Sequence, residues 1–315
     1  MIGSHLVKRL LDEGREVTVA DDFSRSGKLN LEELKIRSDF RRIDLRDYAQ
    51  ALEAIDGAGV VFHLAAIVAS LECLHKNETA ELRVFQDNVM IDVNVLKACL
   101  ERGISKIIYT SSVSVYPIDT QQRQGVVLSE ADLRTNNPEG GYGWAKLLGE
   151  IQLGLMTKTE VGIARIFNVY GEGEPLDETA HVIPALVRKA VLYPKQEFLV
   201  WGDGSQSRCL LYVSDCVDAL MKLEEKASRP QPLVVNLGSD QAVSVKEIAE
   251  KIIRVSGKNI EPRYDSAKPV GPLSRTADIS RARRLLGWEP SVSLDEGLQR
   301  TYSWAKKRLS NTLGV

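Results

Sequence analysis

Short apolar runs alternate with amphipathic stretches through the first 115 residues of this 315-residue chain. SHLVKRLLDEG has apolar residues at helical spacing, a serine at its start and Gly14 as a stop, and the run EVTVA that follows is typical of a strand. DFRRIDL, GVVFHLAA and ISKIIYTSS predict further strands, separated by helices such as NVMIDVNVLKACLERG. Strands in this rhythm pair in parallel, with helices on both faces. The sequence therefore predicts an α/β fold around a doubly wound parallel sheet.

The amino-acid composition changes near residue 170. Glycine and proline are more frequent after it, in YGEGEP, WGDGSQS and AKPVGPLS. SVKEIAEKIIRVSGK is still a well-marked helix, with a capping box of Ser244 and Glu247 and with Gly257 beyond its end. We expect residues 1–168 to form the domain of the doubly wound sheet. Residues 169–315 are expected to form mainly a smaller ligand-binding lobe, with some segments returning to the sheet.

The opening of the chain departs from the usual order of elements. A doubly wound nucleotide-binding sheet normally begins with a strand and a glycine-rich turn before its first helix. Here the chain opens with MIGSHL, so we interpret Gly3 as the last glycine of a G-x-x-G-x-x-G turn. This interpretation makes Met1 an internal methionine, with about ten residues before it. A helix that merely tolerates Gly3 near its start is the alternative.

Composition and charge exclude several kinds of partner. The formal net charge of -2 offers no basic field to a nucleic-acid backbone, so an anionic ligand must be bound by local groups. The apolar stretch near GVVFHLAAIVASL is much shorter than the ~20 residues that span a bilayer, so no membrane partner is expected. The four cysteines and four histidines are scattered, which predicts neither a metal site nor disulfides and fits reduced thiols in the cytoplasm.

Two aspartates follow the predicted strand EVTVA, about twenty residues after the glycine turn. Asp21 and Asp22 stand at the carboxyl end of that strand, where a carboxylate can accept both hydroxyls of an adenosine ribose. A carboxylate there also repels a 2'-phosphate, which favours NAD over NADP. A turn or helix-cap aspartate is the structural alternative. The predicted NAD pocket includes the ends of the next two strands, at Asp44, Leu45, Leu64, Ala65 and Ala66.

Tyr142 and Lys146 stand four positions apart in PEGGYGWAKLLGEI, and spacing alone does not make them a catalytic pair. The same spacing recurs at Tyr264 with Lys268 and at Tyr302 with Lys306. The stretch around Tyr264 is interrupted by prolines, and the helix of Tyr302 carries apolar residues that packing explains. The context of each pair must therefore decide its role.

The strand IIYTSSVSVY delivers Ser112 to the carboxyl edge of the sheet, where doubly wound folds bind ligands. Thirty residues later, Tyr142 and Lys146 share one face of a predicted helix. A lysine ammonium near a phenol favours the phenolate and lowers the pKa of the tyrosine from ~10. We expect Ser112 to hold a substrate oxygen that exchanges a proton with Tyr142.

With Ser112, Tyr142 and Lys146 in this order, the chain resembles the extended short-chain dehydrogenase/reductase family, and within it the nucleotide-sugar epimerases and dehydratases. The resemblance covers essentially the whole length and includes ARIFNVYGEGE, HVIPALVRKA, WGDGSQSRCLLYVSDCVDAL, VVNLGSD and RTADISRARRLLGWEP. It implies a Rossmann-like fold, NAD as the cofactor and a nucleotide-diphosphate sugar as the substrate. It also implies a homodimer joined through the helices around residues 88–102 and 142–157 as a four-helix bundle.

The resemblance assigns further residues. Asn168, Arg208 and Arg275 match positions that hold the diphosphate and its nucleotide, and Asn88 matches an asparagine of the cofactor pocket. Two guanidinium forks and an amide suit a dianionic group. For Asp215, with Ser214 in YVSDCVDAL, we favour a structural role at the start of a helix.

Position 114 bears on the reaction. The dehydratases and UDP-glucuronate decarboxylases of the family carry an acidic residue there, whereas this chain has Ser114. That leaves an epimerase, and inversion at C4 of a hexose is the simplest reaction. As the resemblance implies it, Tyr142 takes the proton of O4, hydride passes from C4 to NAD, and hydride returns to the opposite face of a transient 4-keto sugar.

Several stretches, among them SSVSVYP and PVGPLSRTADI, also resemble GDP-mannose 3,5-epimerases. Those enzymes use a cysteine at the position of Ser114 and a lysine near HVIPALVRKA, where one alignment places His181 and another Val182. Serine is a much weaker base than a thiolate, so 3,5-epimerisation, with Ser114 and His181 as an altered pair, is the alternative. A non-catalytic dinucleotide-binding protein and a simple alcohol dehydrogenase are the remaining interpretations.

Overall fold

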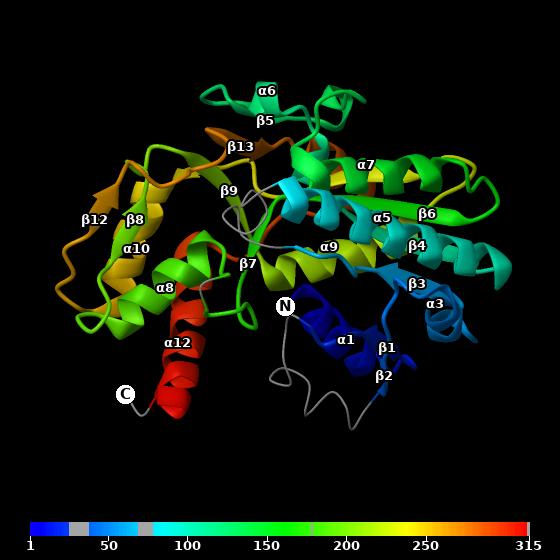
Figure 1. The fold of residues 1–315 in the computed structure, drawn as a ribbon, viewed down its shortest axis with the longest axis horizontal. Helices are drawn as coiled ribbons and strands as arrows, with labels where there is room; N and C mark the ends of the chain where they lie inside the picture. The colour runs from blue at the N-terminus through cyan, green and yellow to red at the C-terminus, as the bar shows by residue number, and fades with distance from the viewer. Residues whose placement is uncertain (25–37, 69–77, 178, 314–315) are drawn as a thin grey trace.

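The computed structural model describes residues 1–24, 38–68, 78–177 and 179–313. Its larger lobe is built on a parallel sheet with the strand order β10-β6-β4-β3, which lies to the right in Figure 1. The strands are β3 (Val60–His63), β4 (Lys106–Ser112), β6 (Glu160–Ile166) and β10 (Leu233–Leu237). Every pairing in this sheet is parallel, and β10 comes from the second half of the chain. The predicted α/β fold with a parallel sheet is confirmed.

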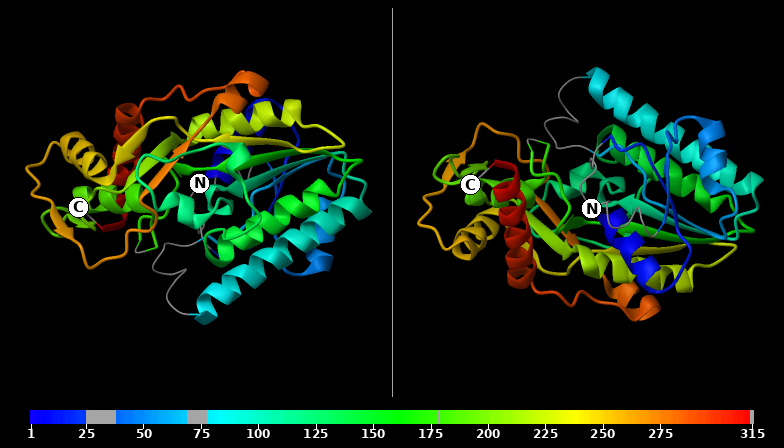
Figure 2. Two further views of the ribbon diagram at one scale, coloured as in Figure 1. Left: turned by 90° about the horizontal axis from the view of Figure 1, so that it is seen from above. Right: turned by 90° about the horizontal axis from the view of Figure 1, so that it is seen from below.

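Helices cover both faces of the sheet, as the two views of Figure 2 show. One face carries α5 (Glu78–Glu101) and α7 (Gly140–Gly154), with α3 (Tyr48–Ile55) against α5. The other carries α9 (Val213–Lys226), with α1 (Ile2–Asp12) and α11 (Ser280–Leu286) against α9. Successive side chains of a strand point to opposite faces, so Ile107 packs under α5 and Ile108 under α9. Both faces are buried, which explains the continuous apolar run KIIY.

A second pair of parallel strands, β1 (Thr18–Asp21) and β2 (Asp39–Arg42), is not hydrogen-bonded to the main sheet. Residues of β1 and of β3 line the same large cavity. The first helix begins at Ile2, so Ser4 lies inside its first turn and donates to the carbonyl of Met1 instead of capping the helix. Gly14 ends the helix region with a φ of 79°, as its position in the sequence suggests.

The second lobe packs three helices around a core of its own, at the left of Figure 1. These helices are α8 (Val182–Leu192), α10 (Val245–Ser256) and α12 (Leu294–Leu313). The strands with them are β7 (Asn168–Tyr170), β8 (Leu199–Trp201), β9 (Ser207–Tyr212), β11 (Ala242–Ser244), β12 (Arg263–Asp265) and β13 (Ser274–Ala277). Short elements between the lobes are η1 (Val113–Val115), α6 (Ile118–Gln121), β5 (Val127–Leu128) and η2 (Glu130–Asp132). The domain boundary at residues 168 and 169 stays a prediction.

The predicted ends of α10 are confirmed. Ser244 accepts a hydrogen bond from the amide of Glu247 at 3.1 Å, and Gly257 ends α10 in the left-handed conformation. Asp215 accepts three hydrogen bonds from Ser291 and Val292, so its role is structural. Among the described residues, no helix is both long and apolar enough to cross a membrane, and no cluster of His, Cys, Asp and Glu could hold a metal ion.

Gly149 brings α7 close to the sheet. A Cβ atom at this position would lie 2.2 Å from the hydroxyl oxygen of Tyr109 and 2.8 Å from Oδ2 of Asp92. Gly154, at the end of the same helix, has no heavy atom within 4 Å of the equivalent position. The two glycines therefore differ in what a methyl group would meet.

We expect Gly149→Ala to lower the free energy of unfolding by about 1–3 kcal/mol, because the new methyl group overpacks a buried site. Gly154→Ala is the matched control and is expected to raise it by up to ~1 kcal/mol through helix propensity. Urea denaturation of both variants measures the difference. Equal effects at the two positions would contradict the close approach of α7 to Tyr109.

Candidate active site

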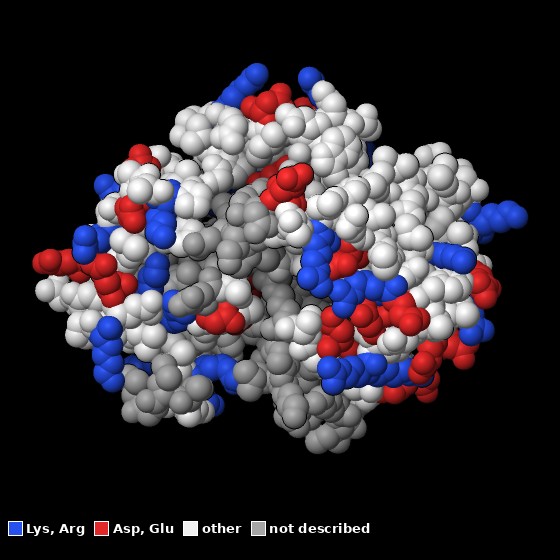
Figure 3. Space-filling view, viewed as in Figure 1, with Lys and Arg blue, Asp and Glu red and all other residues white. Residues whose placement is uncertain are grey.

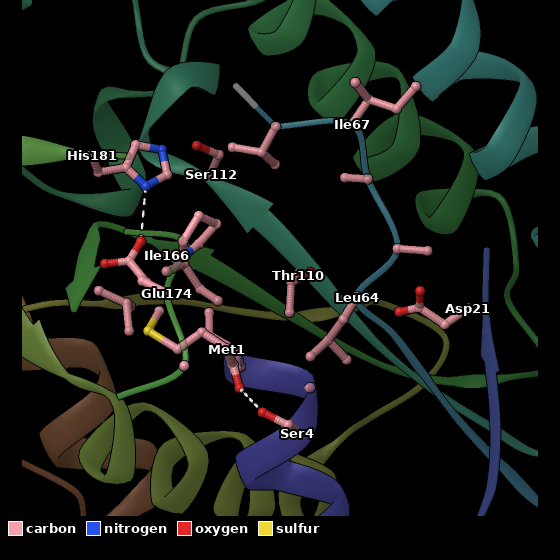
Figure 4. A pocket seen from close by; sticks show the side chains of 18 of the residues that line it. Met1, Ser4, Asp21, Leu64, Ile67, Thr110, Ser112, Ile166, Glu174 and His181 are labelled. Atoms are coloured by element: carbon pink, nitrogen blue, oxygen red, sulfur yellow. Dashed lines mark hydrogen bonds and ion pairs between the residues drawn. The ribbon is translucent and has the colours of Figure 1, made fainter. Parts of the chain in front are cut away.

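A cavity of about 2070 Å³ lies between the carboxyl edge of the parallel strands and the second lobe (Figure 4). It gathers residues that stand far apart in the sequence, and all but one of the predicted site residues line it. These residues are Gly3, Asp21, Asp22, Asp44, Leu45, Leu64, Ala65, Ala66, Ser112, Ser114, Tyr142, Lys146, Asn168, His181, Arg208 and Arg275. The exception is Asn88.

The packing of α7 against η1 and α5 brings Tyr142 to the wall of the cavity near the end of β4. A Cβ atom at Gly143 would lie 2.3 Å from the carbonyl oxygen of Ser114, and one at Gly141 would lie 2.8 Å from the carbonyl oxygen of Glu81. Only glycine permits these approaches. The hydroxyl oxygen of Ser112 accepts a hydrogen bond from the amide of Ser114 at 3.2 Å, so Ser112 is the N-cap of η1.

Lys146 is the buried cation of this wall. Its Nζ lies 4.5 Å from the ring centroid of Tyr109 and has no hydrogen-bond partner among the described residues. Burial lowers the pKa of Lys146, and the negative charges of Asp92 and Glu150 act in the opposite direction. A buried ammonium without a hydrogen-bond partner is costly, which indicates a functional role toward a ligand.

Asp92 lies at the centre of a buried hydrogen-bond network beneath Lys146. Its carboxylate accepts from the hydroxyl of Tyr109 at 2.6 Å and lies 2.8 Å from Nε2 of His63. Burial acts to raise the pKa of Asp92, but the charge of Lys146 and the bonds from His63 and Tyr109 together bring it below the usual value. Asp92 is thus a counter-ion that holds the lysine charge inside the fold.

Glu150 forms the second buried carboxylate site. It pairs with Arg165 at 2.7 Å and accepts from the hydroxyl of Ser111 at 2.5 Å. Sequence reasoning missed both Glu150 and Asp92. A usable signal was present, since Glu150 stands four positions after Lys146 and Asp92 lies on the apolar face of α5.

The carboxylates predicted to bind the cofactor line the cavity at or just beyond the ends of β1 and β2. Asp21 stands at the end of β1 and accepts from the amide of Phe23 at 2.7 Å; burial raises the pKa of its carboxyl group. Asp22 is bonded to Ser24. Asp44 lies beyond the end of β2 and pairs with Arg46, and the hydrogen bonds from that guanidinium lower the pKa of Asp44.

Asn88 is buried and turned toward the protein. Its side chain bonds to the backbone of Ile67 in both directions, at 2.8 and 3.1 Å, and donates to the carbonyl of Val84. Ile67 lines the cavity. These contacts give Asn88 a positioning role on the segment after β3, and a direct contact with the cofactor stays a prediction.

Two arginines and an asparagine line the end of the cavity formed by the second lobe. Arg208 donates to the carbonyls of Ser207, Val270 and Pro272. Burial and the nearby charge of Arg275 lower the pKa of Arg208 to about 10, which leaves it charged at neutral pH. Oδ1 of Asn168 is buried without a hydrogen-bond partner among the described residues. Because a guanidinium has five N–H groups, Arg208 retains donors for a further anion.

Glu139 is a site residue that the sequence interpretation did not include. It precedes α7, accepts from the hydroxyl of Ser114 at 2.8 Å and forms an ion pair with Arg275, which also donates to Gln121. Ser114 is therefore bonded to a carboxylate and, among the described contacts, not to His181. The signal available was a carboxylate three residues before Tyr142.

Of the two other tyrosines spaced like Tyr142, neither shares its setting. Tyr302 is 5% exposed and packs in the core of the second lobe, and Tyr264 is 37% exposed on β12. Neither lines the cavity that holds Ser112. The choice of Tyr142 among the three spacings agrees with these surroundings.

A doubly wound sheet with a serine, a tyrosine and a lysine lining its cavity defines an enzyme of the short-chain dehydrogenase/reductase class. Residues 1–238 match the family model described as the NAD dependent epimerase/dehydratase family. The chain belongs to that family, whose cofactor is NAD.

Known proteins similar to the chain include two kinds of epimerase. GDP-mannose 3,5-epimerase 1 of Oryza sativa subsp. japonica is 30% identical, over 100% of this chain and 82% of that protein. The crystal structure of UDP-glucose 4-epimerase from Thermotoga maritima has a TM-score of 0.87 at 26% identity and covers 98% of this chain and 96% of that one. UDP-glucuronic acid 4-epimerase of Bacillus cereus, in complex with UDP-glucuronic acid and NAD, has a TM-score of 0.85 at 27% identity, with the same coverage.

The buried charge of Lys146 has a consequence for stability. Its pKa in the folded protein lies below the 10.5 of a free lysine side chain, so between these two values the unfolded chain binds more protons. The folded state therefore gains stability from this residue as pH rises through that window. We expect Lys146→Met to reduce the slope of unfolding free energy against pH on the alkaline side.

The slope of unfolding free energy against pH is measured by chemical denaturation at several pH values between 7 and the 10.5 of a free lysine side chain. Lys8→Met, which removes an exposed lysine of α1, is the control for the loss of one charge. A Lys146→Met variant with the slope of the unmodified protein would contradict the burial of its ammonium.

Proposed function

We propose that the protein epimerises a nucleotide-diphosphate hexose at C4 through a transient 4-keto sugar. The observation that carries this proposal is the buried ammonium of Lys146, which has no hydrogen-bond partner among the described residues and lines the same cavity as Tyr142 and Ser112. A cation held there favours the phenolate of Tyr142, which can then take a proton from a sugar hydroxyl. The side chain of Ser112 is suited to hold the sugar hydroxyl in place through a hydrogen bond. Position 114 has no carboxylate of its own, which disfavours dehydration and decarboxylation.

The residues of the cavity fit NAD. Asp21 and Asp22 stand at the carboxyl end of β1 for the ribose hydroxyls, and the segment Leu64–Ala66 lines the cavity next to β3. Lys146 and Tyr142 would complete the site at its reactive end. NAD, when bound, supplies a reversible hydride acceptor. The chain's own residues bind and orient the sugar, keep water from the reacting carbon and hold the proton of O4 on Tyr142.

The nucleotide diphosphate is proposed to bind where Arg208, Arg275 and Asn168 line the second lobe's side of the cavity. Their guanidinium and amide groups provide the local donors that a protein of net charge -2 needs to bind a dianion. Arg275 is paired with Glu139. A bound diphosphate therefore competes with that carboxylate for one guanidinium, or uses the donors left over.

The catalytic proposal is tested with matched tyrosine variants and a panel of UDP- and GDP-hexoses. We expect Tyr142→Phe to lower the rate of C4 inversion by about 10²–10⁴-fold, because the proton acceptor is lost. Tyr264→Phe, with the same spacing to a lysine, is expected to retain the rate. Inversion is followed by chromatography of the sugars, and UDP binding by calorimetry. An unchanged rate of C4 inversion in Tyr142→Phe would contradict the proposal.

A second candidate is 3,5-epimerisation of a GDP-hexose. The similarity to GDP-mannose 3,5-epimerase 1 favours it, as does an imidazole with a carboxylate partner at His181. The two reactions differ in the fate of carbon-bound hydrogen. Exchange with solvent occurs at C3 or C5 in the second reaction, whereas C4 inversion moves a hydride without exchange.

We further propose a homodimer joined through α5 and α7. Large apolar side chains are exposed on these neighbouring helices and on the residue that follows α7. They are Leu82, Met90, Val93, Leu100, Trp144, Ile151 and Leu155. Figure 3 shows few charged side chains over α7 on this face. Met90, Val93 and Leu100 share one face of α5, so a second copy can pack there as a four-helix bundle.

Charge placed on this surface should separate the dimer. We expect Val93→Glu and Ile151→Glu each to weaken dimerisation by about 100-fold or more, because an unpaired carboxylate would be buried. Leu285→Glu, on an exposed apolar residue of α11, is the control. Light scattering after size-exclusion chromatography measures the mass. A protein that is monomeric before substitution would contradict the proposed interface.

A cytoplasmic location is proposed from the cysteines. Cys99, Cys209 and Cys216 are buried and free, and burial raises the pKa of each thiol, to about 12 for Cys99 and Cys216. Unpaired thiols are usual in a reducing compartment.

A further inference from the structure

Two carboxylates line the part of the cavity where the sugar of the substrate is proposed to bind. Glu139 comes from the segment before α7, three residues before Tyr142, and Glu174 comes from the segment between β7 and α8. Their side chains are 13% and 5% exposed, respectively. Figure 4 shows Glu174 and His181 beside the part of the cavity where Ser112 lies. The two glutamates therefore approach the sugar from different sides.

Glu139 is held at the cavity wall formed by α7 through both its backbone and its side chain. Its amide donates to the carbonyl of Ser114 at 2.9 Å, and its carbonyl accepts from the amide of Gly143 at 2.9 Å. The side chain does not cap α7, and its carboxylate accepts instead from the hydroxyl of Ser114 at 2.8 Å. Because Ser114 stands two residues after Ser112, this carboxylate lies near the serine that is proposed to hold the sugar hydroxyl.

Glu174 brings a buried negative charge to the side of the second lobe. Its Oε1 is 2.9 Å from Nδ1 of His181, and its Oε2 is buried without a hydrogen-bond partner among the described residues. A buried carboxylate oxygen without a donor costs free energy that an apolar side chain would avoid. Packing therefore does not explain a charge at this position, which indicates a role toward a ligand.

Neither side of this region has a surplus of positive charge. Glu139 forms an ion pair with Arg275, and the pair of Glu174 with His181 is at most neutral, when the imidazole is protonated. The diphosphate is proposed to bind Arg275. Its negative charge would then offset that guanidinium and leave the carboxylate of Glu139 less neutralised.

The other cations that line this part of the cavity have their own partners. The charge of Lys146 is opposed by two buried carboxylates. Arg188 and Lys189 donate to backbone carbonyls of the second lobe. Lys268 lies 5.3 Å from the ring centroid of Trp201. Among the described residues, these contacts leave no cation dedicated to an anionic group on the sugar.

We propose that Glu139 and Glu174 select a hexose that is neutral at C6 and exclude a hexuronate. This inference rests on the proposed function, which places the sugar between Ser112 and the diphosphate. Hydroxyl groups of a neutral sugar donate charge-assisted hydrogen bonds to these carboxylates. The C6 carboxylate of a hexuronate has no hydrogen to donate and repels both glutamates in a site that excludes water.

The position of the glutamates on two sides of the sugar matters for an epimerase. The 4-keto sugar presents opposite faces to the cofactor before and after hydride return, so its C6 substituent changes place in the cavity. A carboxylate at C6 would meet a glutamate in either orientation. The substrate class is therefore a nucleotide-diphosphate hexose with a hydroxymethyl or methyl group at C6.

Matched sugar nucleotides that differ only at C6 test this inference. The full chain with NAD is mixed with UDP-glucose or UDP-glucuronate, and with GDP-mannose or GDP-mannuronate. Calorimetry gives the dissociation constant of each, and chromatography gives the rate of C4 inversion. In the pair that is inverted, we expect kcat/KM of the neutral sugar to exceed that of the uronate by about 100-fold, as expected when like charges are brought together.

Removal of either charge should narrow this difference. Glu174→Gln and Glu139→Gln should each lower the ratio of the two kcat/KM values by about tenfold, mainly through a smaller dissociation constant of the uronate. Glu139→Gln also releases Arg275, so UDP or GDP alone is the reference for binding of each sugar nucleotide. Glu197→Gln is the matched control, because Glu197 is exposed, pairs with Arg263 and does not line the cavity. It should leave the ratio unchanged.

Two outcomes would overturn the inference and leave the proposed function intact. One is C4 inversion of a hexuronate by the unmodified protein with a kcat/KM equal to or above that of its neutral partner. The other is a ratio that neither glutamate variant changes more than Glu197→Gln does. The two glutamates lie on different elements, so a variant that fails to fold leaves the other as the test. An absence of C4 inversion with all four sugar nucleotides would instead overturn the proposed function, whatever their dissociation constants.

Discussion

The burial of one positive charge organises this site. Lys146 lies over the ring of Tyr109, and the nearest carboxylates that oppose its charge are Asp92 and Glu150. Each of these carboxylates is buried in turn and is satisfied by its own hydrogen bonds. The lysine can be kept inside the fold only because this second layer exists, since an isolated ammonium in an apolar interior would lose its proton or unfold its surroundings.

The hydrogen bonds and charges around Lys146 also connect the cavity wall formed by α7 to the main sheet. Asp92 comes from α5, Tyr109 from β4 and Lys146 from α7, so three elements must be in register for the charge to be balanced. Gly149 allows α7 to approach Tyr109 closely enough. A perturbation of this packing is therefore expected to alter the stability of the fold and the position of Tyr142, one helical turn before Lys146.

The two walls of the cavity carry different charge arrangements. On the wall of the main sheet, a lysine has no hydrogen-bond partner among the described residues. On the side of the second lobe, a histidine is held by a carboxylate, and an arginine is paired with Glu139. The cavity is therefore lined by a buried cation on one side and by a carboxylate-bound histidine and a paired arginine on the other.

The sequence alone determined the alternation of strands and helices, and it selected the serine, tyrosine and lysine of the candidate active site and the carboxylates after β1, because these depend on local periodicity and on motifs. It did not reveal Asp92, Glu139, Glu150 or Glu174. Isolated carboxylates are common on protein surfaces, and only tertiary packing decides which are buried beside a cation or a histidine. Packing also decided that Asn88 holds Ile67 and that Ser114 pairs with Glu139, since both contacts join segments more than twenty residues apart.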